Sequence, residues 1–356
     1  MEPFVILNTG LSIGGSSPIR VNCNIGCNSV EEYQTEMEKL CFLKECGELP
    51  DMMMDLSLVN VEKPLYLAIR DELNLSFGTV LSYHGFSNKK GLSWEKSKAE
   101  LIKLCEEGVS FVTVHFTADL DLLQKAKLLR KIPMTSRGGG IVLYDSVYNH
   151  RIQNIFREHI NEIVEIVMKY EVAISIGTTF RPATILDACD EVHIEETNRQ
   201  LAICQYLTKR GVKVMVENIG HITLDKLSQH ADLLKSFHAP IMPLGPIPTD
   251  YAIGQDHISN AIGSSVAACL GVAHIINSVT RHEHSQSHIS AEITMEAIKT
   301  ARIAAHIADV SRQIPEAVIK DKLITNKRAS LHKCFADGSD CNRCSTVCPL
   351  KILIDD

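Results

Sequence analysis

Short apolar runs rich in β-branched residues alternate with longer amphipathic stretches along most of this chain. The strand candidates are "IRVNCNIG", "MMMDLS", "FGTVLSY", "VSFVTVHF", "VAISIG", "VKVMVENIG", "APIMPLG" and "AHIINSV". Helical patterns such as "SWEKSKAELIKLCEEG", with apolar residues three and four apart, lie between them. Alternating β and α units imply parallel strands, and eight units over roughly 300 residues favour a closed (β/α)8 TIM barrel. The open doubly wound α/β sheet is the alternative.

The alternation predicts one catalytic barrel domain over residues 1–314, followed by a C-terminal helix and a cysteine-rich tail over residues 315–356. Hydrophobic residues make up 45% of the 356 residues, which is enough for a large core. The net charge is −7 and the basic residues are scattered, so no footprint for nucleic acid is present. Neither a membrane span nor a basic leader is readable, and we expect a cytoplasmic protein.

Polar, aromatic or metal-ligating side chains follow almost every predicted strand. In barrel enzymes the chemistry lies at the carboxyl ends of the strands. One such residue is usually a hydrogen-bonded structural group, whereas many at one end favour an active site. The candidates are Asn24, Met54, Asp55, Tyr83, His84, His115, Arg181, Glu217, His221, Asp250, His282, Glu283 and His284.

Two features indicate what this end of the barrel binds. "SRGGG", from Ser136 to Gly140, offers a hydroxyl, a guanidinium and a flexible run of backbone N–H groups suited to a phosphate. A glycine-rich segment is equally often only a turn. His221 and His284 follow neighbouring even-numbered strands and can share a divalent metal, with Glu217 nearby as a base or a further ligand.

Three cysteines near the C-terminus indicate a second metal centre. Cys341, Cys344 and Cys348 form a CxxCxxxC pattern followed by proline, similar to the end of the bacterial ferredoxin pattern. Three thiolates leave one iron of a 4Fe-4S cluster open, and S-adenosylmethionine requires an open iron. The alternative is a closed structural zinc site completed by Cys334. Buried structural thiols are expected at Cys41, Cys46, Cys105, Cys189, Cys204 and Cys269.

Several segments resemble the phosphomethylpyrimidine synthase (ThiC) family. In the family's order, from about Val21 to Pro349, they are "VNCNIG", "MDLS", "FGTV", "VTVH", "SRGGG", "RPATILDACDE", "VMVENIGH", "LGPIPTDYAIGQDHISNAIGSSVAA", "EH", "ARIAAHIAD" and the cysteine cluster. The resemblance implies a radical S-adenosylmethionine carbon–carbon lyase on a (β/α)8 barrel. It also implies a homodimer, a 4Fe-4S cluster on the tail, Zn²⁺ or Fe²⁺ at a histidine pair, and a reductase or flavodoxin as electron donor.

The resemblance further implies a substrate and residue roles. Family members convert 5-aminoimidazole ribotide into hydroxymethylpyrimidine phosphate for thiamine, and related members make 5-hydroxybenzimidazole for cobalamin. His221 and His284 match the metal ligands, and the three tail cysteines match the cluster ligands. The catalytic positions are His115 and Glu217. The substrate-contacting positions are Asn24, Met54, Tyr83, His115, Ser136, Arg137, Gly138, Arg181 and Glu217.

This chain departs from the family pattern at several positions. Thr178 replaces an acidic substrate contact, Met242 replaces a tyrosine, and the second gap of the cysteine motif has three residues instead of four. Lost polar partners change which substrate a hydrogen-bonding site accepts. We therefore expect a divergent paralogue that acts on a phosphorylated small molecule. A non-catalytic, zinc-stabilised protein that binds a phosphorylated ligand is the alternative from another class, and a zinc hydrolase using the histidine pair is a third.

Overall fold

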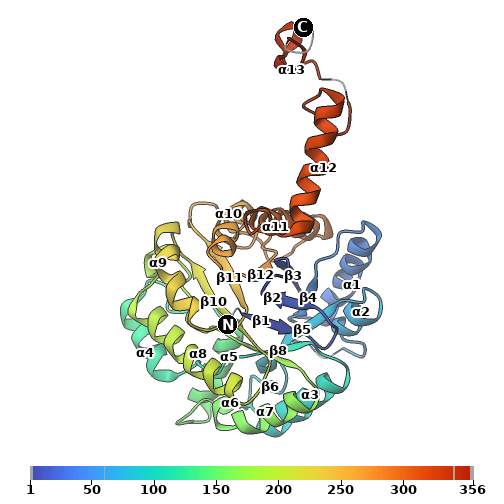
Figure 1. The fold of residues 1–356 in the computed structure, drawn as a ribbon. Coiled ribbons are helices and arrows are strands. Elements are labelled where there is room, and N and C mark those ends of the chain that lie inside the picture. Colours follow the sequence, from blue (N-terminus) through green and yellow to red (C-terminus); the bar gives the residue numbers. More distant parts are fainter. Residues whose placement is uncertain (1–2, 60, 340, 353–356) are drawn as a thin grey trace. The chain divides into compact units, whose positions relative to one another are not determined.

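The computed structural model describes residues 3–59, 61–339 and 341–352. One compact unit ends at Ala308, and a second begins at Asp309. In the described part of the first unit, eight parallel strands form a ring surrounded by helices (Figure 1). The strands of this ring are β3 (Arg20–Ile25), β4 (Met52–Asp55), β5 (Ser76–Val80), β8 (Phe111–Val114), β9 (Ala173–Ile176), β10 (Val214–His221), β11 (Ile241–Ile247) and β12 (Ile275–Asn277).

The ring closes between β11 and β12, the two ends of the strand order. Neighbouring strands pair in parallel in the order β12, β3, β4, β5, β8, β9, β10, β11. Just before β12, the His274 N–H donates to the Ile241 carbonyl of β11 at 2.8 Å, and the His274 carbonyl accepts from the Arg20 N–H of β3 at 3.0 Å. These bonds join the two edges, so the predicted closed barrel is confirmed and the open sheet is excluded.

A helix follows each barrel strand, which is the expected right-handed βα arrangement. The link between β8 and β9 is longer and carries four helices. Ser93 and Asp190 cap two of the helices by accepting backbone N–H groups. The helices are α1 (Val30–Glu45), α2 (Leu65–Asp71), α3 (Trp94–Glu106), α4 (Leu120–Leu129), α5 (Arg137–Tyr148), α6 (Ile155–Glu158), α7 (Ile160–Lys169), α8 (Glu191–Lys209), α9 (Leu224–Lys235), α10 (Asp256–Cys269) and α11 (Ala291–Ser311).

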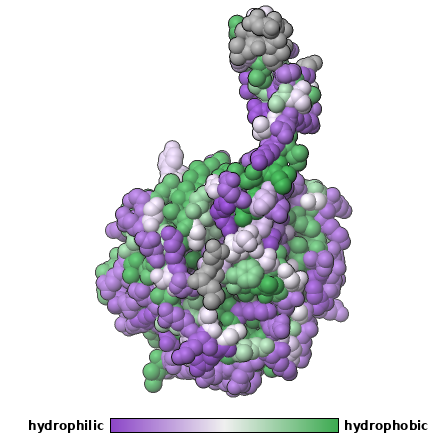
Figure 2. Space-filling view, in the orientation of Figure 1, coloured by the Kyte–Doolittle hydropathy of each residue, from purple (hydrophilic) through white to green (hydrophobic). Residues whose placement is uncertain are grey.

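A hairpin that the sequence analysis did not predict closes the amino end of the barrel. Its strands are β1 (Phe4–Ile6) and β2 (Ser12–Gly14), and it lies across the ring in Figure 1. The Asn8 side chain donates to the Val109 carbonyl at 2.8 Å, near the start of β8. Hydrophilic side chains predominate around this end (Figure 2). Beneath the hairpin lies a small apolar core of Val5, Leu7, Ile13, Met52, Met54, Val80, Phe111, Ala173, Met215, Met242 and Ile275.

The larger apolar core lies between the strands and the surrounding helices, as in other barrels of this kind. Cys105 and Cys204 are buried there, as predicted. The prediction of buried thiols is wrong for Cys41, Cys46 and Cys269, which are exposed on or next to the solvent side of their helices. A second small hairpin, β6 (Phe86–Ser87) with β7 (Gly91–Leu92), and the short turns η1 (Leu81–Tyr83) and η2 (Ile185–Asp187) complete this unit.

The second unit contains helix α12 and a short tail. Pro315 begins α12 (Pro315–Leu331), where its fixed φ suits the first helical position and its missing N–H costs no bond. The residue after the helix, His332, caps it with a left-handed φ of 47°. The tail contains η3 (Ser345–Val347) and α13 (Pro349–Ile352). Across the described residues, every helix is too short or too polar to span a bilayer.

Candidate active site

A cavity of about 490 Å³ lies at the carboxyl end of the barrel strands. Its volume falls within the range of roughly 300–1,000 Å³ that is typical of small-molecule sites. All the barrel residues to which the sequence assigned a binding role line this one cavity. They are Asn24, Met54, Tyr83, His115, Ser136, Arg137, Gly138, Arg181, Glu217, His221 and His284.

Glu217 is a buried carboxylate on β10, within the wall of the cavity. Burial raises its pKa to about 7, although a hydrogen bond from Thr113 and the positive charge of Arg181 oppose the rise. The Thr113 hydroxyl donates to Glu217 Oε1 at 2.7 Å. Burial also lowers the pKa of Arg181, which Glu217 partly offsets. Glu217 can therefore exchange a proton near neutral pH, as a general acid or base requires.

His115 lines the same cavity as Glu217 and is a neutral imidazole. Burial, helped by the charge of Arg181, lowers its pKa to about 3. Its Nε2 lies 3.1 Å from the Ser136 hydroxyl. Its Nδ1 is buried and has no hydrogen-bond partner among the residues that the structure describes. This nitrogen packs against Gly138, where a Cβ would lie 3.0 Å from it.

The "SRGGG" segment differs from the flexible turn that the sequence predicted. Ser136 accepts from the Gly139 N–H at 3.0 Å and so starts helix α5 at Arg137. A helix amino end has unpaired N–H groups and a positive dipole, which favour anions. Gly138 is closely packed, because a Cβ there would lie 2.4 Å from His115 Cε1. The segment is therefore an ordered helix start and not a flexible turn.

Arg137 is held at the mouth of this helix by three hydrogen bonds. It donates to the Tyr83 hydroxyl, to Asn28 Oδ1 and to the Leu56 carbonyl, each at 2.9 Å. Its guanidinium also lies over the Tyr83 ring, 4.7 Å from the centroid. These contacts fix a cation beside the amino end of α5, so both place positive charge at the same wall of the cavity.

His221 and His284 are brought together as the sequence predicted, with ring centroids 4.9 Å apart. Each Nδ1 is held by a carboxylate: His221 by Asp250 at 2.6 Å and His284 by Asp256 at 2.8 Å. Metal-binding histidines characteristically have such a carboxylate on the nitrogen that does not bind the metal. The Nε2 atoms remain for coordination, so the pair fits a divalent metal ion.

The backbone of β10 turns sharply just before His221. The pairing of β10 with β11 shifts register between Ile219 and His221, which marks a β-bulge. Gly220 has a φ of 111°, and a Cβ there would lie 2.5 Å from the Pro182 carbonyl oxygen. The His221 N–H donates to the same oxygen at 2.9 Å. The bulge thus packs this end of β10 against the segment that follows Arg181.

Three residues of the site escaped the sequence reasoning. Glu36 and Lys39 line the cavity from α1, and Lys39 Nζ lies 2.6 Å from Glu36 Oε1. Asp256, which holds His284, lies in the first turn of α10. All three are on helices, whereas the barrel rule directs attention to strand ends. The only sequence signal for Glu36 and Lys39 as site residues was the spacing of opposite charges three positions apart. That spacing is also typical of exposed helix surfaces.

Thr178 and Met242, two positions where this chain differs from the family pattern, lie behind the cavity wall. Neither residue is among the described residues that line the cavity. The Thr178 hydroxyl donates to Glu196 Oε2 at 2.8 Å. Met242 is fully buried in the small core inside the barrel.

The tail cysteines flank a short turn in the second unit. Cys344 precedes η3 and Cys348 follows it. Cys334 is exposed beyond the end of α12. Within the described residues, the tail thiols do not form a group with ligand atoms within 4.8 Å of one another. Thiolates of a 4Fe-4S cluster bind different irons and stand farther apart than ligands of one ion, so three cysteines remain a fitting donor set.

The fold and cavity define a (β/α)8 barrel whose cavity is lined by a positively charged helix start and a carboxylate-held histidine pair. The chain belongs to the Radical SAM ThiC family, which matches residues 7–336. It is 33% identical over 331 residues to a phosphomethylpyrimidine synthase from Desulforamulus reducens, covering 90% of this chain and 76% of that relative. These matches confirm the family resemblance, and membership implies a 4Fe-4S cluster and S-adenosylmethionine as cofactors. The family match ends before Cys341, so the assignment of the cysteines stays a prediction.

A solved structure with a similar fold is a dihydropteroate synthase from Xanthomonas albilineans, determined with 4-aminobenzoic acid. It has a TM-score of 0.50 and 12% sequence identity, covering 88% of this chain and all of that one. At this identity the likeness concerns the barrel fold alone.

Proposed function

We propose that this protein is a radical S-adenosylmethionine lyase that converts 5-aminoimidazole ribotide into hydroxymethylpyrimidine phosphate for thiamine biosynthesis. The observation that carries the proposal is the convergence, in one cavity of a ThiC-family chain, of the α5 anion site, the Glu217–Arg181 pair and the carboxylate-held histidines. The phosphate, the sugar and the base of the substrate would each contact side chains of matching chemistry.

The residues of the cavity suggest a division of work. Arg137 and the amino end of α5 would bind the phosphate. His115, which lines the cavity, would contact the imidazole or ribose of the substrate. Glu217 would accept or return a proton, since its pKa of about 7 lies close to the working pH. Asn24 and Tyr83 would complete the substrate contacts.

The cofactors would be bound by two further sets of residues. His221 and His284 would hold Zn²⁺ or Fe²⁺ through Nε2, with Asp250 and Asp256 orienting the rings. Cys341, Cys344 and Cys348 would hold the 4Fe-4S cluster, with an open iron for S-adenosylmethionine. When bound, the reduced cluster and S-adenosylmethionine would supply the radical chemistry of the reaction. The reaction would need a reductase or flavodoxin as electron donor, and we propose a cytoplasmic homodimer.

The test is an anaerobic reaction with the reconstituted full-length protein. Iron and sulfide are loaded first, and S-adenosylmethionine, a reductant and 5-aminoimidazole ribotide are then added. The proposal expects 5′-deoxyadenosine and a product with the mass of hydroxymethylpyrimidine phosphate. A product with the mass of 5-hydroxybenzimidazole would instead identify the protein as an enzyme of cobalamin biosynthesis. Failure to form 5′-deoxyadenosine with a fully loaded cluster would refute radical chemistry.

The alternative of a non-catalytic zinc-stabilised protein makes a different prediction. Cys334 lies in the same unit as the other three cysteines, so four thiolates are available for a closed zinc site. Under this alternative, protein purified without reconstitution contains tail zinc that Cys334→Ser removes. Under the lyase proposal, Cys334→Ser leaves the iron content of the reconstituted protein unchanged.

A further inference from the structure

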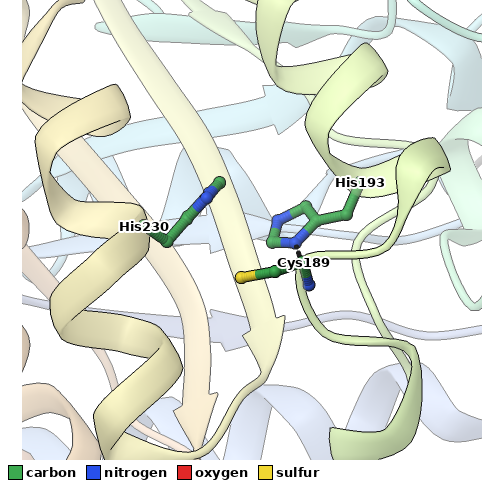
Figure 3. A group of neighbouring side chains, drawn as sticks. All are labelled: Cys189, His193 and His230. Atoms are coloured by element: carbon green, nitrogen blue, oxygen red, sulfur yellow. Dashed lines mark hydrogen bonds between the residues drawn. The ribbon is translucent and has the colours of Figure 1, made fainter.

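A second group of metal-binding side chains lies among the helices outside the cavity. Cys189 follows η2, His193 lies near the start of α8, and His230 lies on α9. Each offers one ligand atom, and the three atoms lie within 4.8 Å of one another. Figure 3 shows the three side chains converging from separate segments. None of them lines the active-site cavity.

The backbone presents Cys189 in an unusual way. Its φ is 60°, a left-handed conformation that side chains other than those of glycine, asparagine and aspartate seldom adopt. The next residue, Asp190, caps α8 by accepting the His193 N–H at 2.8 Å. Asp190 is also paired with the buried Arg130 at 2.7 Å. The thiol is therefore placed by a fixed helix start, and a non-glycine residue with this backbone is a recurrent feature of functional sites.

Both rings are oriented by one amide oxygen. Asn218 Oδ1 lies 3.4 Å from His193 Nε2 and 3.2 Å from His230 Nε2. The Asn218 amide group donates to Gln200 Oε1 at 2.7 Å, which fixes its oxygen toward the rings. Each ring therefore carries its hydrogen on Nε2 and presents a lone pair at Nδ1. A backbone or side-chain oxygen on the distal nitrogen is the arrangement that surrounds metal-bound histidines.

The lone pair of His230 is unused. His193 Nδ1 accepts from the Cys189 N–H at 3.2 Å, whereas His230 Nδ1 is buried without a hydrogen-bond partner among the described residues. Burial lowers the pKa of both rings, that of His230 to about 4, so both stay neutral at pH 7. Two neutral imidazoles and a thiol converge, and a buried polar atom with no partner is costly unless a ligand occupies it.

We propose that Cys189, His193 and His230 bind a structural Zn²⁺ ion that joins the loop after β9 to helices α8 and α9. Thiolate and imidazole are preferred zinc ligands, with bonds of about 2.3 Å and 2.0–2.1 Å. Tetrahedral ligand atoms at these distances stand about 3.3–3.6 Å apart, so small side-chain shifts suffice. His193 Nδ1 would exchange the Cys189 amide hydrogen for the metal, and a water would complete four ligands.

The charges around the thiol are of both signs. Burial is the main cause that raises the pKa of Cys189; the positive charge of Lys226 opposes the rise, and the negative charges of Asp190 and Asp225 add to it. With Zn²⁺ bound, one thiolate and two neutral rings would leave a net charge of +1 at the site. The two carboxylates would stabilise that charge, whereas Lys226, whose Nζ donates to the Ala188 carbonyl at 2.9 Å, would oppose it. Direct coordination of the thiolate by the cation would offset the effect of burial on the thiol.

Cobalt substitution tests the site in the full-length chain. The three tail cysteines are first changed to serine so that they contribute no thiolate. Co²⁺ is then expected to give a near-ultraviolet thiolate-to-cobalt charge-transfer band that saturates at one site per chain. Adding Cys189→Ser should abolish the band, whereas Cys41→Ser, a change at an exposed thiol on α1, should keep it. Lack of the band in the starting protein would overturn the proposal.

A second measurement needs no substitution at the site, so it holds even if the variants fail to fold. Wild-type protein is alkylated with iodoacetamide in excess Zn²⁺ or in chelator, and the labelled peptides are followed by mass spectrometry. Zinc is expected to slow the labelling of Cys189 at least tenfold and to leave that of Cys41 unchanged. Equal labelling of Cys189 in both conditions, fast or slow, would overturn the proposal.

Discussion

Replacing Glu217 with glutamine is expected to change how the stability of the barrel depends on pH. In the folded chain this carboxyl has a pKa of about 7 because it is buried, whereas the ordinary value is 4.5. The stability that its protonated form contributes is fully present below pH 4.5 and is lost as the pH rises through 7. Glutamine stays neutral, so the variant does not lose this contribution.

The magnitude follows from the separation of the two pKa values. A difference of about 2.5 units corresponds to roughly 3.4 kcal/mol at high pH. Between pH 5 and pH 8 the free energy of unfolding of the variant, relative to wild type, should rise by about 2.5 kcal/mol. Arg181 loses a partner in the variant, but it stays charged throughout this range. The loss of this partner therefore changes the difference in unfolding free energy between the variant and wild type by the same amount at every pH. The dependence of that difference on pH is unchanged.

Urea unfolding of the metal-free protein, followed by tryptophan fluorescence, measures this slope. Trp94 is the single tryptophan and is largely buried on α3, so it reports on the barrel. Glu165→Gln is the matched control, because Glu165 is exposed on α7 and its change removes no buried carboxylate. A pH-independent difference between wild type and Glu217→Gln, or one that falls with pH, would refute the reasoning.

Three further substitutions, the first with a matched control, test other residues. Gly138→Ala should lower the free energy of unfolding by about 1–3 kcal/mol through overpacking, as measured in the same urea assay. Gly140→Ala is the control: its Cβ would make only ordinary contacts, so its free energy of unfolding should differ from wild type by less than about 1 kcal/mol. Asp250→Asn should weaken metal binding by His221 about 10- to 100-fold, as read by titration against a competing chelator; an unchanged affinity would contradict the role of this carboxylate. Cys344→Ser should lower the iron bound on reconstitution and abolish 5′-deoxyadenosine formation, and full iron content would argue against a ligand role.

The fold was predictable because its two periodicities are long and regular. Buried parallel strands appear as continuous β-branched runs, and their alternation with amphipathic helices leaves few topologies. Once the barrel is assumed, strand ends such as Asn24, His115 and Glu217 must converge, and the structure places them in one cavity. Their individual roles stay predictions.

The features that were missed have too little local signal to be read from the sequence. The strands of the β1–β2 hairpin have three residues each, too few to establish an alternating pattern. The "SRGGG" segment has three consecutive glycines, which disfavour a helix, and the cap from Ser136 together with packing against His115 overrides that preference. The Cys189 group joins residues about 40 positions apart, so its proximity depends on how α8 and α9 pack.

Asp250 connects two parts of the site that would bind different ligands. One of its oxygens holds His221, while the other accepts from the Thr184 hydroxyl at 2.6 Å and from the Ile185 N–H at 3.1 Å, in the segment just after Arg181. If bound substrate orders that segment, less conformational entropy is lost when a metal ion then binds to His221. Thermodynamic reciprocity then requires that each ligand tighten the binding of the other by the same factor.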